Sequence, residues 1–168
     1  MGISTGPDGR LAAFGNQLID VHIWLREELA RLRDDVDDHL AGGGERPREL
    51  RAHCLAFCSA LTRHHTAEDE GVFPALARHS PELAPVLEQL AHDHHMVTGM
   101  LGRLQDLVDG IGPAPSPAEA RRVRGELDGL VALVESHFTY EEKKLVDALN
   151  ALGAPLPDDF ALRDAPGR

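Results

Sequence analysis

Histidine and glutamate recur inside the apolar stripes of this chain, and these residue types are common ligands of metal ions in proteins. The chain has ten histidines among 168 residues. Four of them each occupy a core position in the 3/4 spacing of apolar residues, one in each of four segments: His22, His64, His94 and His137. Two glutamates follow one turn after a histidine, at Glu68 and Glu141.

These two glutamates are not expected in an ordinary core. An ionised carboxylate among apolar side chains is very costly unless it is compensated, and no lysine or arginine shares the stripes of Glu68 and Glu141. The i, i+4 spacing points His64 and Glu68 to one helix face, and His137 and Glu141 likewise. A metal cation would compensate both carboxylates and bind the four imidazoles at once.

The donor types narrow the choice of metal. Imidazole and carboxylate without thiolate suit iron, manganese or zinc, rather than an iron–sulfur cluster or copper(I). Two carboxylates on different helices, each able to bridge, fit a site with two metal ions. If both bridge, the six side chains fill about eight of the twelve positions of two octahedral ions. Water, oxide or a small exogenous ligand would take the remainder.

Several neighbours of these residues have less specific positions. His65 is turned about 100° from His64 on a helix, so we expect it at the surface or just outside the ligands. Asp69 and Glu142 are also expected just outside the ligands, where a carboxylate can orient a ligand histidine. Weaker ligand candidates flank the third stripe at His92 and His95. Surface positions are expected for the histidines at segment ends, namely His39, His53 and His79.

Four helices must position the candidate ligands. Apolar residues recur with a helical period, and the segments are separated by breaks at 41–47, at Pro74 with His79–Pro81, and at 110–117. Few residues are β-branched, and none alternate with polar residues as in a strand. The pattern predicts an all-α, up-down-up-down four-helix bundle with helices of about 25–37 residues.

Local signals support these segments. Ser80 and Ser116 are each followed by proline, which is the pattern of a helix start. Glu119 completes a capping box with Ser116. Cys54 and Cys58 are neither a C-x-x-C motif nor a disulfide framework, so they are predicted to be small buried side chains.

Length and composition favour one soluble domain. The predicted bundle spans 11–152, with tails at 1–10 and 153–168. No apolar run approaches the roughly 20 residues of a membrane span, and the N-terminus lacks the features of a signal peptide, so a cytoplasmic protein is predicted. The net charge of −11 argues against nucleic acid and anionic membranes as partners. The abundance of arginine, alanine and glycine suggests a bacterial source.

In these motifs the sequence resembles the prokaryotic hemerythrin-like family, also called the HHE cation-binding domain, over roughly residues 11–152. The resemblance rests on 21–26 around His22, on 64–69 followed by 72–74, on Asp93-His94 followed by Val97 and Leu101, and on 137–142. It implies a non-haem di-iron centre that can carry an oxo or hydroxo bridge. The resemblance implies terminal ligands at His22, His64, His94 and His137, and bridging ligands at Glu68 and Glu141.

Two departures separate this sequence from the oxygen-carrying hemerythrins. Those proteins have two histidines spaced i, i+4 on the third helix, whereas Thr98 stands four residues after His94 here. They also have an aspartate five residues after the fourth-helix histidine, whereas this chain has Glu141 at four and Glu142 at five. Both departures argue against simple reversible oxygen carriage.

Three functions remain open from the sequence. The first is di-iron chemistry on hydrogen peroxide, oxygen or nitric oxide, including a peroxide-decomposing enzyme active in oxidative stress. The second is a protein that senses, carries or stores oxygen, nitric oxide or iron without turnover. The third is a helical interaction module with structural histidines, which leaves Glu68 and Glu141 uncompensated. The first is favoured because missing ligands leave coordination positions open.

Overall fold

Four long helices form the part of the chain that the structure describes. The computed structural model describes residues 14–42 and 47–152, so the predicted tails at 1–10 and 153–168 lie outside the described residues. The long helices are α2 (Phe14–Leu40), α3 (Pro47–Ala67), α5 (Ala84–Asp109) and α6 (Pro117–Ala151). Three short elements connect α3 to α5, namely a π-helical turn η1 (Glu68–Val72), helix α4 (Phe73–His79) and a 3-10 turn η2 (Pro81–Leu83). Within the described ranges there is no strand.

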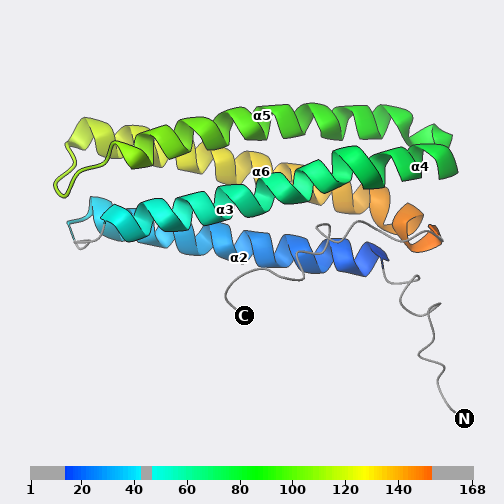
Figure 1. The fold of residues 1–168 in the computed structure, drawn as a ribbon, viewed down its shortest axis with the longest axis horizontal. Coiled ribbons are helices and arrows are strands. Elements are labelled where there is room, and N and C mark those ends of the chain that lie inside the picture. Colours follow the sequence, from blue (N-terminus) through cyan, green and yellow to red (C-terminus); the bar gives the residue numbers. More distant parts are fainter. Residues whose placement is uncertain (1–13, 43–46, 153–168) are drawn as a thin grey trace, which may run out of the picture.

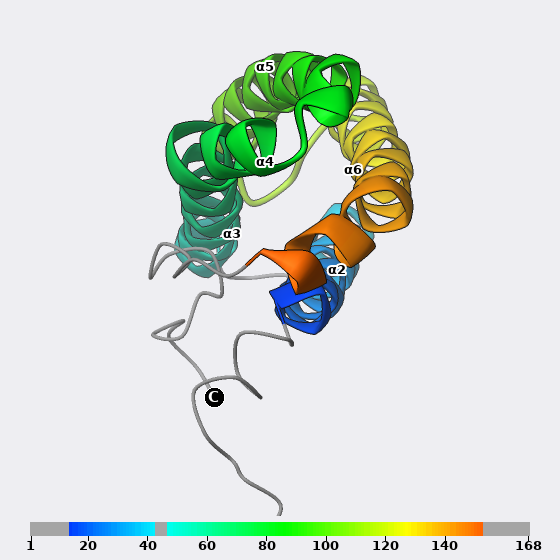
Figure 2. The ribbon, with the colours of Figure 1, turned by 90° about the vertical axis from the view of Figure 1, so that its right-hand side faces the viewer.

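The long helices are arranged as an up-down-up-down bundle (Figure 1). Helix α2 packs against α3 and α6, and α5 packs against the same two helices. Viewed along the bundle, the four helices therefore surround a common axis (Figure 2). The prediction of an all-α four-helix bundle is confirmed.

The apolar stripes predicted from the sequence face this axis. Leu18, Leu25, Leu61, Leu90 and Leu130 are all fully buried, and burying one such side chain contributes about 1.5–3 kcal/mol. Cys54 and Cys58 are buried and free, as predicted. Among the described residues, no helix is long and apolar enough to cross a membrane.

One glycine allows the first and last helices to approach closely. A Cβ atom at Gly15 would lie 2.6 Å from the carbonyl oxygen of Val146 and 2.8 Å from Oδ1 of Asn150. The backbone N–H of Gly15 donates a hydrogen bond to that same Oδ1 at 2.8 Å. A side chain at position 15 would push α2 away from α6.

The predicted break at Pro74 is wrong. Proline lacks the N–H that a helix needs, yet the chain remains helical through η1 and α4 up to His79. The turn before Pro74 widens instead, and the N–H of Phe73 bonds to the carbonyl of Glu68, five residues earlier. The helix ends only at Ser80, whose N–H bonds to the Leu76 carbonyl.

The capping predictions have different outcomes. The Ser116 hydroxyl accepts a hydrogen bond from the N–H of Glu119 at 3.1 Å, as predicted. Ser80 makes no side-chain cap, because Pro81–Leu83 forms a 3-10 turn before α5 begins.

The surface position expected for His39 is wrong. Its ring is buried, and Nε2 lies 3.0 Å from the carbonyl oxygen of Gly112 in the α5–α6 loop.

Candidate metal centre

All six predicted ligands meet inside the bundle. They come from α2 (His22), α3 (His64), η1 (Glu68), α5 (His94) and α6 (His137 and Glu141). Each of these side chains is buried. A seventh residue, His65, joins them and is also buried, with 5% of its surface exposed. The surface position considered for His65 is therefore wrong.

The first donor group consists of His22, His64 and Glu141, whose ligand atoms lie within 4.8 Å of one another. Nε2 of His22 is 3.3 Å from Nε2 of His64. Nε2 of His22 is also 3.7 Å from Oε1 of Glu141. Nitrogen and oxygen donors thus converge from three helices, as metal ligands do.

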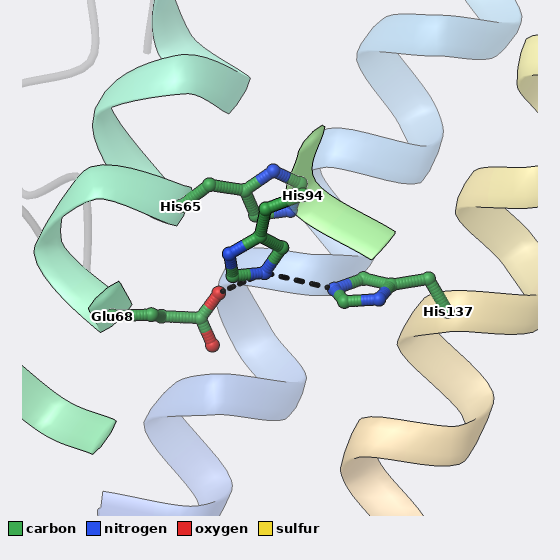
Figure 3. A group of neighbouring side chains, drawn as sticks. All are labelled: His65, Glu68, His94 and His137. Atoms are coloured by element: carbon green, nitrogen blue, oxygen red, sulfur yellow. Dashed lines mark hydrogen bonds and ion pairs between the residues drawn. The ribbon is translucent and has the colours of Figure 1, made fainter. Parts of the chain in front are cut away.

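The second donor group consists of His65, Glu68, His94 and His137, again within 4.8 Å of one another (Figure 3). Nε2 of His94 lies 3.2 Å from Nε2 of His137 and 3.4 Å from Oε1 of Glu68. The ring of His65 stacks on that of His94, with the centroids 3.8 Å apart.

The two glutamates connect the donor groups. Oε1 of Glu141 faces His22, while Oε2 lies 3.1 Å from Nε2 of His137. Oε1 of Glu68 lies 3.4 Å from Nε2 of both His64 and His94. Each carboxylate therefore faces one imidazole of each group, which is the placement that a bridge between two ions needs.

These carboxylates lack adequate partners within the protein. In the described part of the chain, all four oxygens of Glu68 and Glu141 are buried without a hydrogen-bond partner. Burial and the neighbouring charge of Glu141 raise the pKa of Glu68 well above its usual value. Leaving such groups uncompensated costs several kcal/mol, on the order of the penalty for a buried ion. A metal cation would remove this penalty, so the residues fit one.

The π-helical turn sets the direction of two of these side chains. Such turns are rare and occur frequently at functional sites. Here the turn contains Glu68, which faces the two groups, and Asp69, whose Oδ1 lies 2.8 Å from Nδ1 of His94. One widened turn thus places a carboxylate on each side of the same imidazole.

Carboxylates also contact the outer nitrogens of two other histidines. Oε1 of Glu142 lies 3.2 Å from Nδ1 of His22, and Oδ2 of Asp93 lies 3.1 Å from Nδ1 of His137. An acceptor there fixes the ring and leaves Nε2 free to bind a metal. Asp69 and Glu142 were expected beside the ligands, whereas Asp93 was missed. Its position next to His94 suggested no contact with His137 on another helix.

Arg26 forms an ion pair with Glu142, the carboxylate that contacts the outer nitrogen of His22 in the first group. Its guanidinium donates to both oxygens of Glu142, at 2.9 and 3.2 Å, and to Glu135 at 2.8 Å. Burial opposes ionisation of Glu142, but hydrogen bonds from His22 and Arg26 outweigh it and lower its pKa to about 2. Phe138 stacks on the His22 ring, with centroids 3.8 Å apart, and Arg26 lies over Phe138.

The remaining histidines do not reach either group. His79, His92 and His95 are exposed. The two weaker ligand candidates, His92 and His95, therefore point away from the centre. His53 is half-buried, and its Nδ1 lies 2.6 Å from Asp35.

One comparison with known proteins agrees with this geometry. The sequence profile described as the hemerythrin HHE cation binding domain matches residues 15–149. That range includes every member of the two donor groups. No curated protein matches the chain, and no solved structure matches it either.

Proposed function

Because the chain belongs to the hemerythrin HHE cation-binding family, we propose that it binds two non-haem iron ions, one at each donor group. Glu68 and Glu141 carry this proposal, because each faces an imidazole of both groups and has no other adequate partner. Histidine and carboxylate donors suit iron, and manganese or zinc can substitute.

We propose that small oxidants, such as hydrogen peroxide, oxygen or nitric oxide, are handled at this centre. When bound, iron supplies the redox chemistry that amino acid side chains lack. The protein's contribution is to hold the donors. Asp69, Asp93 and Glu142 fix the rings of three histidines, and the buried apolar side chains around them exclude bulk water.

Enclosure of the centre favours small ligands. Glu68, Glu141 and the histidines of both groups are buried, and such an enclosed centre favours a ligand of a few atoms. The net charge of −11 disfavours nucleic acid and anionic membranes as partners. A cytoplasmic location goes with this proposal.

Peroxide breakdown is the direct test. Iron-loaded protein, with no added electron donor, should release oxygen from hydrogen peroxide at a measurable rate. Glu141→Gln should abolish this release, whereas His92→Gln, which alters an exposed histidine, should leave it unchanged. A fully iron-loaded protein that forms a stable, reversible oxygen complex and shows no peroxide turnover would support a carrier or sensor instead. A protein that takes up no metal would overturn both functions.

A further inference from the structure

The second donor group contains an imidazole that the predicted ligand set lacks. His65 is buried, and its Nε2 is inaccessible to solvent and has no hydrogen-bond partner among the described residues. Buried polar atoms nearly always have a partner. The ligand atoms of Glu68, His94 and His137 nevertheless lie within 4.8 Å of the one that His65 offers.

The position of His65 follows from the wide inner face of α3. Adjacent residues on a helix are about 100° apart, and α3 packs against both α2 and α5. His64 therefore points toward His22 on α2, with their Nε2 atoms 3.3 Å apart. His65 points toward α5, where its ring stacks on His94 with an interplanar angle of 12°.

The inner face of α3 is divided along the helix into residues that face α2 and residues that face α5. Neighbouring residues are buried in pairs, at Phe57 and Cys58 and again at Ala60 and Leu61, before the pair His64 and His65. The inner face of this helix thus carries two stripes. One stripe supplies a histidine to the first donor group, and the other supplies a histidine to the second.

Helix α5 does not provide a second histidine one turn after His94 that could take the place of His65. One turn after His94, the Thr98 side chain is exposed, and its hydroxyl donates a hydrogen bond to the His94 carbonyl at 2.9 Å. Val97 occupies the buried position instead. Helix α5 therefore offers a single imidazole to the second group.

On the basis of the proposed function, we propose that His65 is a metal ligand. It supplies a third imidazole to the second ion, beside His94 and His137, while the first ion has two, from His22 and His64. The two ions then differ in their donors. The second ion is bound more tightly, and open positions for an exogenous ligand belong mainly to the first.

Cobalt(II) is a suitable probe because its absorption spectrum reports the number of its ligands. Metal-free wild-type protein, titrated with cobalt(II), should bind two ions per chain. His65→Phe keeps an aromatic ring against His94 but removes the nitrogen, so affinity for one of the two ions should fall at least about tenfold, with a changed spectrum. His95→Phe, at an exposed histidine, is the matched control and should match the wild type.

The structural alternative is that His65 only fills space by stacking. It predicts that His65→Phe binds both cobalt ions with wild-type affinity and spectrum, and that result would overturn the proposal. Wild-type protein that binds no cobalt at the centre would instead overturn the proposed function.

A second measurement does not depend on the variant folding. In wild-type cobalt protein, each bound imidazole gives its own paramagnetically shifted, exchangeable N–H proton signal. Five such signals are expected, one from each histidine of the two groups. Four signals would show that His65 is not bound.

Discussion

The two donor groups differ most in the charges that surround them. Outside the first group, Arg26 neutralises the carboxylate that contacts His22, so a cation bound there has a guanidinium nearby. Outside the second group, Asp69 and Asp93 contact His94 and His137, and among the described residues neither aspartate pairs with an arginine or lysine. The imidazoles of the two groups thus lie in different electrostatic environments, and the environment of the second group favours a cation more strongly.

This difference shows how a nearly symmetric bundle produces two unlike sites. Helices α3 and α6 each contribute to both groups, through His64 and His65 and through Glu141 and His137. The difference in surrounding charge comes mainly from the helices between them: α2 carries an arginine one turn after its histidine, whereas α5 carries an aspartate directly before its histidine.

If two ions bind as proposed, their removal should have the largest effect. The metal-free core brings together the buried carboxyl groups of Glu68 and Glu141, and metal binding to the native state alone is linked to folding. We expect chelation to lower the thermal midpoint by on the order of 10 °C. Calorimetry on a verified metal-free sample measures this, and an unchanged midpoint would show that the core tolerates these groups unaided.

Ligand substitutions should then separate the two groups. Glu141 faces both groups and His22 faces only the first, so Glu141→Gln should reduce iron to less than about one ion per chain, whereas His22→Ala should leave about one. Elemental analysis of purified variants measures iron per chain. Equal iron contents would mean that Glu141 does not connect the groups.

In the metal-free protein, Glu68 should make the free energy of unfolding depend on pH. Its pKa is raised above the usual 4.5 by burial and by Glu141, so the native state holds a proton that the unfolded chain releases. The free energy of unfolding should therefore fall as pH rises from about 4.5 through the raised pKa.

Substituting Glu68 by glutamine removes that proton uptake. Glu68→Gln should stabilise metal-free protein at neutral pH by about 1–3 kcal/mol and flatten the pH dependence. Urea unfolding in chelator between about pH 5 and pH 8 tests this. A destabilised variant would indicate that an ionised Glu68 is accommodated without metal.

Substitutions of the carboxylates that contact the Nδ1 atoms of the ligand histidines should have the smallest effects on metal binding. Each effect should be confined to one donor group. Glu142→Gln should weaken binding of the first ion roughly tenfold, and Asp93→Asn should weaken binding of the second by a similar factor. Calorimetric titration with cobalt(II) resolves the two steps. Asp128→Asn, at an exposed aspartate paired with Arg33, is the control. Loss of both ions from either variant would mean that the groups are not separable.

Much of this protein follows from periodicity in the sequence. The apolar stripes predict four helices, and a histidine within each stripe predicts a shared location near the bundle axis. The spacing of His64 with Glu68 and of His137 with Glu141 places each pair on one face. These features are local to single helices, so they can be recognised before the packing is known.

Features that depend on how helices face one another could not be predicted in this way. Asp93 contacts a histidine on another helix, and His39 is buried because the α5–α6 loop covers it. The stripe through Cys54, Cys58, Leu61, His65 and Glu68 is visible in the sequence, but a second stripe through His64 accounts equally well for the same segment.

The sequence by itself determined the helices, their inner faces and six donors that belong together. The tertiary structure decided that α3 lies between two helices, which buries both His64 and His65 and directs them to different donor groups. It also decided that Pro74 lies within a helix, because the π-helical turn accommodates the missing N–H. Periodicity shows which face of a helix is buried, but only the packing shows which neighbour each part of that face meets.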